Sequence, residues 1–131
     1  MVTTSHSTAG VWAGRVLSLL VVVALFGVAA NMLLAKTTAH AQLAATGFPD
    51  SAGALIGITA IVCAGIYAIP QTSVLGAILI TGFLGGAICT HFRLGEMGSP
   101  PQVISLVLGV IAWGGLYLRF PEVRSLLPIR L

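Results

Sequence analysis

The stretch AGALIGITAIVCAGIYAIPQTSVLGAILITGFLGGAICT, residues 52–90, decides the fold. It contains two apolar runs, 52–69 and 73–90, and neither run carries a charged residue. A helix of roughly 20 apolar residues crosses the hydrocarbon core of a bilayer. Pro70 ends the first run and Thr72 is a favoured residue type for starting the next helix. The stretch therefore predicts two membrane-spanning helices joined in a tight antiparallel hairpin.

Two further apolar runs flank this hairpin. The first covers 11–35, with Arg15 and Asn31 inside it, and the last covers 103–118. All four runs are continuously apolar, whereas the strands of a membrane barrel alternate apolar and polar residues. We therefore predict an all-α integral membrane protein, an antiparallel bundle of four transmembrane helices that forms a single membrane domain over residues 1–131.

The segments between the runs contain turn-forming residues. Residues 39–50 include glycine, proline and several polar residues, and we predict a loop there, with Asp50 or Ser51 capping the next helix. Residues 91–101 are predicted as a second loop, which ends in a pair of prolines.

The composition agrees with a lipid environment. The 131 residues are 57% hydrophobic and 7% charged, whereas soluble domains carry about 25% charged residues. A soluble protein this apolar would expose large apolar patches to water. Only six basic and three acidic residues are present, so the sequence offers no basic patch for nucleic acid. Cys63 and Cys89 lie in separate runs, which predicts neither a disulfide framework nor a zinc site.

The distribution of Lys and Arg predicts an orientation. With four spans, both termini lie on one side of the membrane. That side would hold Arg15, Arg119, Arg124 and Arg130, whereas the other would hold only Lys36 and Arg93. Because cytoplasmic segments are enriched in Lys and Arg, we expect both termini in the cytoplasm.

The first run has an alternative interpretation as a signal peptide. Ala39-His40-Ala41 resembles a cleavage site, and cleavage there would leave three spans. However, the apolar stretch 16–35 is longer than the apolar core of about 7–15 residues that signal peptides have. We therefore favour a retained first span.

Small residues predict close helix packing. Glycines recur at a spacing of four in the pairs Gly10–Gly14, Gly53–Gly57 and Gly82–Gly86. In lipid, helices associate through such small residues because their backbones can approach closely. We expect these glycines to pack within the chain; the alternative is a homodimer face.

Polar residues gather at the end of the predicted bundle away from the termini. The topology places a candidate rim pocket there, formed by Asn31, Lys36, His91 and Arg93, with His40, Asp50 and Glu96 in the adjoining loops. Ionisable residues at the edge of a bundle are candidates for function. The alternative is structural, with Lys36 and Arg93 extending to lipid headgroups.

The interior of the spans carries little chemistry. No acidic residue falls inside any run, and a proton-coupled exporter needs a buried carboxylate, so transport is disfavoured. No residue is predicted to be catalytic or to bind a metal. Tyr67, Trp113 and Tyr117 lie toward the terminal side and are predicted to form an aromatic belt.

A longer motif resembles a known family. Residues 68–93, AIPQTSVLGAILITGFLGGAICTHFR, are similar to the core of the DoxX-like family. The supporting pieces are GFP at 47–49, WGGLYLR at 113–119 and LLPIR at 126–130. The resemblance covers about residues 47–130 well and the first run loosely. One departure is Gln71, where the family usually has a basic residue.

The resemblance implies a four-helix protein of the bacterial cytoplasmic (inner) membrane with an uncleaved first span. The family takes its name from a subunit of a thiosulfate:quinone oxidoreductase, and some relatives are linked to redox or oxidative-stress systems. It gives no established catalytic residue to transfer to this chain.

Two functions of different classes follow as hypotheses. The first is a small membrane subunit or scaffold without catalysis of its own, which associates with other membrane or redox proteins or with a second copy. The alternative is a quinone-linked redox protein, or one that binds a small molecule or lipid, using the candidate pocket and quinone as an external cofactor. A transporter is the least favoured function.

Overall fold

The computed structural model describes residues 8–127, and the regular elements it forms there are all helices. Three segments are long and apolar enough to cross a membrane: Thr8–Leu34, Pro70–Arg93 and Pro100–Arg119. A fourth apolar helix, Ala52–Ala68, is shorter, with 17 residues. At 1.5 Å per residue it is about 25 Å long, slightly less than the hydrocarbon thickness of about 30 Å. The all-α prediction is confirmed.

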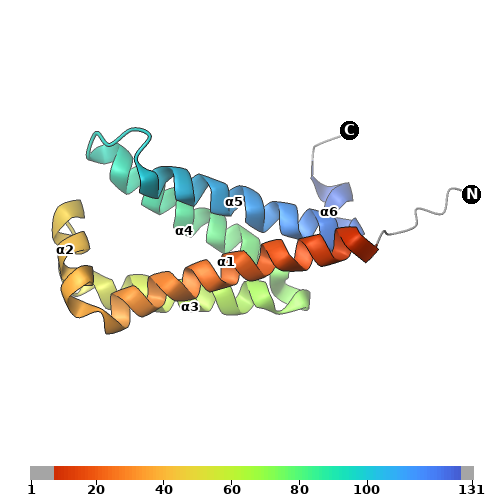
Figure 1. Ribbon diagram of the computed structural model, residues 1–131, viewed down its shortest axis with the longest axis horizontal. Helices are drawn as coiled ribbons and strands as arrows, with labels where there is room; N and C mark the ends of the chain where they lie inside the picture. The colour runs from red at the N-terminus through yellow and green to blue at the C-terminus, as the bar shows by residue number, and fades with distance from the viewer. Residues whose placement is uncertain (1–7, 128–131) are drawn as a thin grey trace, which may run out of the picture.

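The elements follow one another in a simple order. They are α1 (Thr8–Leu34), α2 (Lys36–Thr46), α3 (Ala52–Ala68), the 3₁₀ turn η1 (Pro70–Thr72), α4 (Ser73–Arg93), α5 (Pro100–Arg119) and α6 (Pro121–Leu126). Helix α1 packs against α3 and α5, and α4 packs against the same two helices. The four helices therefore run side by side and alternate in direction (Figure 1). Both ends of the described chain lie at the same end as η1, and α2 lies across the opposite end.

The prediction of a loop over residues 39–50 is wrong for most of that segment, because α2 continues to Thr46. Its alanine-rich sequence favours a helix, and Ala39 and Leu43, one turn apart, are both buried. Gly47 ends the helix in the left-handed conformation, with φ of 78°. The amides of Gly47 and Phe48 donate to Ala44 and Leu43, the C-terminal cap that glycine permits.

The connection between α3 and α4 is as tight as its sequence predicts, but its bonds differ. Thr72 stands at the N-cap position of α4 without a capping bond. Its hydroxyl donates instead to the Ile66 carbonyl at 2.8 Å. Ser73 donates to the carbonyl of Tyr67 at 2.9 Å. Both hydroxyls therefore satisfy carbonyls at the end of α3, which the proline turn leaves without helical partners.

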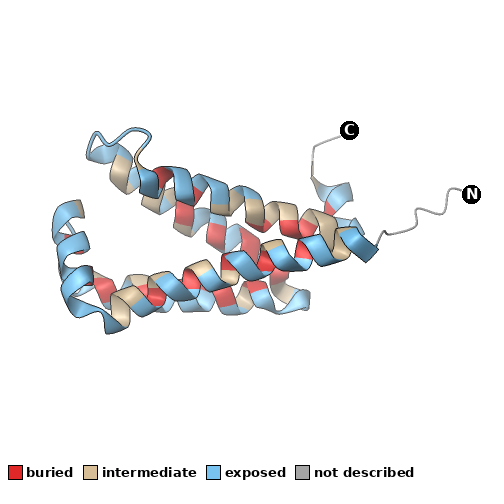
Figure 2. Ribbon diagram, in the orientation of Figure 1, coloured by how far each residue is buried: buried red, intermediate tan, exposed pale blue. Residues whose placement is uncertain are grey.

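The outward faces of the helices are exposed (Figure 2), and they carry many large apolar side chains. Large aliphatic side chains such as Leu19, Leu55 and Leu106 are 61%, 69% and 62% exposed. The inward faces carry small residues and a few larger ones, including Val21, Leu25 and Ile80. A chain that exposes this much hydrocarbon suits lipid as its solvent.

At the end that holds the termini, glycines bring the helices into direct contact. A Cβ at Gly115 of α5 would lie 2.7 Å from the Ser18 hydroxyl of α1. A Cβ at Gly76 of α4 would lie 2.4 Å from backbone atoms of Tyr67 in α3. Both distances are too short for a side chain, so these contacts require glycine.

The prediction that Tyr67 belongs to an aromatic belt is wrong. Its side chain is completely buried between the helices. Its hydroxyl donates to the Ala112 carbonyl of α5 at 2.7 Å. The same oxygen lies 3.0 Å from the Ser18 hydroxyl of α1. Because the tyrosine proton is used at Ala112, Ser18 is the donor in the second bond. One side chain of α3 thus joins three helices.

Arginines mark this same end of the bundle. Three of the four predicted there lie over aromatic rings, with guanidinium-to-ring distances of 5.3 Å for Arg15 and Trp12, 4.9 Å for Arg119 and Phe120, and 5.2 Å for Arg124 and Tyr117. The fourth, Arg130, lies outside the described residues.

Candidate functional site

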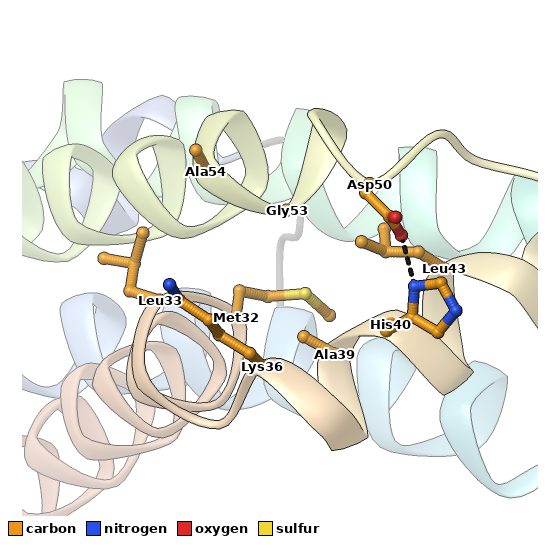
Figure 3. A pocket seen from close by; sticks show the side chains of 9 residues that line it. All are labelled: Met32, Leu33, Lys36, Ala39, His40, Leu43, Asp50, Gly53 and Ala54. Atoms are coloured by element: carbon orange, nitrogen blue, oxygen red, sulfur yellow. Dashed lines mark hydrogen bonds and ion pairs between the residues drawn. The ribbon is translucent and has the colours of Figure 1, made fainter.

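The end of the bundle away from the termini carries an open hollow. Helix α2 turns away from α1 after a single residue, Ala35, and α3 begins beside both helices. The three enclose a volume of about 390 Å³, which is within the range of small-ligand pockets. The hollow is lined by Met32, Leu33, Lys36, Ala39, His40, Leu43, Asp50, Gly53 and Ala54 (Figure 3).

The walls of the hollow are mainly apolar. Met32 and Leu33 come from the last turns of α1, and Leu43 comes from the buried face of α2. Gly53 keeps the α3 side open, because a Cβ there would already lie 3.2 Å from the Leu43 side chain. The space exists because α2 leaves the bundle direction while α3 presents a glycine at its start.

Charged side chains border these apolar walls. Lys36 and Asp50 lie on opposite sides of Met32, as Figure 3 shows. Among residues 8–127 the ion pairs are His40–Asp50 and His91–Glu96, and Lys36 belongs to neither. The lysine ammonium is therefore available to a ligand of opposite charge.

His40 fixes the position of Asp50. The Nδ1 atom of His40 lies 2.6 Å from Oδ1 of Asp50, which joins α2 to the short connection before α3, since Asp50 lies two residues before the helix starts. The two side chains are 67% and 70% exposed, so water screens their attraction and the pair adds little stability. The prediction that Asp50 or Ser51 caps α3 is wrong, because Ser51 stands at the N-cap position without a capping bond and Asp50 bonds His40 instead.

Two other predicted residues hold α2 in place. Asn31 donates from Nδ2 to Oε1 of Gln42 at 2.7 Å, which links α1 to α2. Arg93, the last residue of α4, donates from Nη2 to the Thr46 carbonyl at 2.8 Å. This carbonyl belongs to the last turn of α2, where a cation is favourable.

His91 bonds within its own loop. Its Nδ1 lies 2.7 Å from Oε2 of Glu96. Of the four residues predicted for the rim pocket, only Lys36 lines the hollow; Asn31 and Arg93 contact α2 elsewhere, and His91 belongs to the α4–α5 connection. No three His, Cys, Asp or Glu side chains within the described chain lie close enough together to hold a metal ion.

A model of the DoxX-like family matches residues 16–115 of this chain, most of its length. The chain belongs to the DoxX-like family. Neither the curated proteins nor the solved structures that were searched contain a match. The predicted resemblance is confirmed, and with the apolar helices it makes this DoxX-like chain a multi-pass membrane protein.

The matched region includes both ends of the bundle. It contains the whole of α2 and the hollow, and also Tyr67, Gly76 and Gly115 of the tightly packed end. It stops before Arg119 and α6. Both structural features of this DoxX-like chain therefore lie within its family region.

The predicted packing glycines occupy two different environments. Gly53 and Gly57 of α3 are buried, and a Cβ at Gly57 would lie 2.8 Å from Cγ of Leu33. Gly82 and Gly86 of α4 are exposed, and a Cβ at either would meet no atom of another described helix within 4 Å. The first pair lies in a helix contact of the DoxX-like chain, and the second pair faces outward.

The sequence contained only weak signals for the residues that were missed. Ala39 and Leu43 have the spacing of one helical face, which was a sign of α2 inside the predicted loop. Met32 and Leu33 belong to an apolar run and gave no sign that they would line a hollow. Tyr67 was the largest polar side chain near the hairpin, but nothing in the sequence identified its partners.

Proposed function

We propose that this DoxX-like protein is a small membrane subunit or scaffold without catalysis of its own, which associates with other membrane or redox proteins. In this proposal α1, α3, α4 and α5 all span the membrane as an antiparallel bundle. The membrane is the bacterial cytoplasmic membrane, and both termini face the cytoplasm.

The observation that carries the proposal is the contrast between the apolar outer faces of the helices and the buried polar residues, which bond to other groups of the chain. The four buried polar residues of the described chain all have partners there, whereas the buried hydroxyl of the half-buried Ser99, just before α5, has none. Ser18 bonds Tyr67, Ser73 bonds the end of α3, Gln102 donates to the Ile88 carbonyl at 3.2 Å, and Ser105 donates to the Pro101 carbonyl at 2.8 Å. Buried polar residues that bond to the chain itself support a structural role, because their hydrogen-bonding groups are already used within the bundle.

A transporter is supported less. The acidic residues of the described chain are Asp50, Glu96 and Glu122, and all three lie outside α1, α3, α4 and α5. Proton-coupled exchange through a bundle relies on ionisable groups inside it.

Binding of an amphiphilic small molecule, including a quinone, is the second candidate function. The hollow between α1, α2 and α3 supports it, since apolar walls beside a lysine suit a molecule with a polar head and a greasy tail. In this case a quinone-linked redox role would depend on the bound molecule rather than on a residue of the chain.

Membrane topology is the first test. Reporter fusions after Pro70 and Leu127 should report the cytoplasm, whereas fusions at Gly47 and Gly95 should report the opposite side. Reporters that place Leu127 and Pro70 on different sides would overturn the four-span arrangement.

Purification then separates the two functions. After extraction in a mild detergent, the scaffold hypothesis predicts a membrane protein that copurifies in a fixed ratio and reassociates when the two pure proteins are reconstituted together. A chain that purifies alone with one quinone per copy would favour the second candidate.

A further inference from the structure

The hollow at the far end combines features of a lipid-headgroup site. We propose that it binds the headgroup of a phospholipid that carries both a phosphate and an ammonium group, of the phosphoethanolamine type. The inference rests on the proposed membrane insertion, but it does not depend on whether the chain acts as a scaffold.

The position of the hollow is suited to a headgroup. It lies where the apolar run of α1 ends and the polar helix α2 begins, and such transitions occur at the level of the headgroups. From Ala54 in the hollow, helix α3 continues into Leu55 and Ile58, which are 69% and 53% exposed. Acyl chains can therefore extend along α3 while the headgroup remains in the hollow.

The charges favour a headgroup of two opposite charges. Lys36 attracts a phosphate, because it belongs to no ion pair in the described chain. The carboxylate of Asp50 would repel a headgroup that carries only negative charge, and the ammonium of Lys36 would repel one that carries only positive charge. With these two groups on opposite sides of Met32 (Figure 3), a phosphate at Lys36 and an ammonium at Asp50 satisfy both.

His40 orients the acidic side. It holds Asp50 by one carboxylate oxygen at 2.6 Å, which leaves the second oxygen to accept from an ammonium group. The ionisable groups that line the hollow are Lys36, His40 and Asp50. Arg93, the last residue of α4, does not line the hollow and donates to the Thr46 carbonyl instead.

The experiment measures which lipid the protein retains. The full chain is reconstituted in nanodiscs of equal parts phosphatidylethanolamine and phosphatidylglycerol, transferred to detergent, and examined by native mass spectrometry. We expect one phosphatidylethanolamine per chain, favoured over phosphatidylglycerol by about three- to fivefold, the effect of one exposed charge contact.

Two substitutions give opposite signatures. Lys36→Gln should lower retention of both lipids by about three- to fivefold, since the phosphate loses its partner. Asp50→Asn should reverse the preference toward phosphatidylglycerol, because the repulsive carboxylate is removed and Lys36 remains. Both side chains are exposed, so neither change should unfold the protein, which a thermal melt in the same detergent checks.

Arg93→Gln is the matched control, because it removes a cation from the same rim without touching the hollow. Its lipid retention should equal that of the wild type. Three outcomes would overturn the headgroup site. The wild type would retain both lipids equally, it would retain a quinone in their place, or Arg93→Gln would lose as much lipid as Lys36→Gln. If the headgroup site failed but the reporter fusions gave four spans, the proposed role as a membrane subunit would still stand.

Discussion

The two ends of the bundle are built differently. At the end with the termini, glycines bring α1 against α5 and α3 against α4, and the buried Tyr67 hydroxyl bonds two other helices. At the opposite end, α2 crosses the bundle, a hollow remains open, and the bonds of Asn31 and His40 that hold α2 involve exposed or half-buried side chains. The comparison predicts that the closed end contributes more to the stability of the fold, whereas the open end can change its contacts at a smaller cost.

The difference arises from the kinds of atoms that are in contact at each end. At the closed end, Gly76 faces backbone atoms and Gly115 faces backbone atoms and a serine, and these cannot move aside, so the positions of the helices fix these two contacts. Long side chains such as Lys36 and Arg93 at the open end can change rotamer, and water or headgroups can replace their partners. Substitutions should therefore cost more stability at the closed end than at the open end.

The largest effect should come from adding a methyl group to Gly76. The new Cβ of Gly76→Ala would lie 2.4 Å from backbone atoms of Tyr67, and a backbone cannot rotate away. We expect the free energy of unfolding to fall by about 2–3 kcal/mol, the upper range for overpacking. Unfolding in mixtures of mild detergent and dodecyl sulfate, followed by circular dichroism, measures the change.

Two matched substitutions sharpen this comparison. Gly57→Ala, toward the open end, meets Leu33 at 2.8 Å, but a side chain can shift, so the loss should be below about 1 kcal/mol. Gly82→Ala meets nothing and should raise stability by about 0.5–1 kcal/mol, because alanine is the better helix former. Equal losses at Gly76 and Gly57 would break the distinction between the two ends.

Loss of one hydroxyl at the closed end should have an intermediate effect. Tyr67→Phe keeps the ring but removes the bonds to Ser18 and the Ala112 carbonyl. We expect a loss of about 1 kcal/mol, as for hydrogen bonds between helices in membranes. The same unfolding assay applies, with Tyr117→Phe as the control, since the ring of Tyr117 faces Arg124. No greater loss for Tyr67→Phe than for the control would show that the network is unimportant.

The smallest effect should follow from Arg93→Gln at the open end. The change removes the bond from Arg93 to the Thr46 carbonyl, and both groups can bond to water instead. Global unfolding should be unchanged within error. Amide hydrogen exchange should nevertheless become faster in the last turn of α2, which loses its tie to α4, whereas the turns that line the hollow keep the Asn31–Gln42 and His40–Asp50 bonds. Unchanged exchange in residues 36–46 would indicate that other contacts hold this helix.

Much of the architecture was predictable from local sequence. Pro70 predicted the position of the hairpin, because proline has no backbone N–H and its ring clashes with the preceding helical turn. Gly47 and Pro49 supported the predicted loop over residues 39–50, but they mark only the end of α2 and the turn after it, and the helix before them was not predicted. Asn31 and Arg93 were expected at one end of the bundle, yet their partners in α2 required knowing that α2 exists.

The sequence by itself determined the solvent of this protein, the approximate limits of its long helices, their alternating direction and its family, because hydrophobic runs and prolines act within a few residues. Only the tertiary structure decided that Tyr67 meets Ser18, 49 positions away, and that Lys36 and Asp50 border one hollow. Such meetings depend on how each helix is rotated about its axis and how closely glycines let it approach its neighbours. These are properties of pairs of helices, and no single segment contains them.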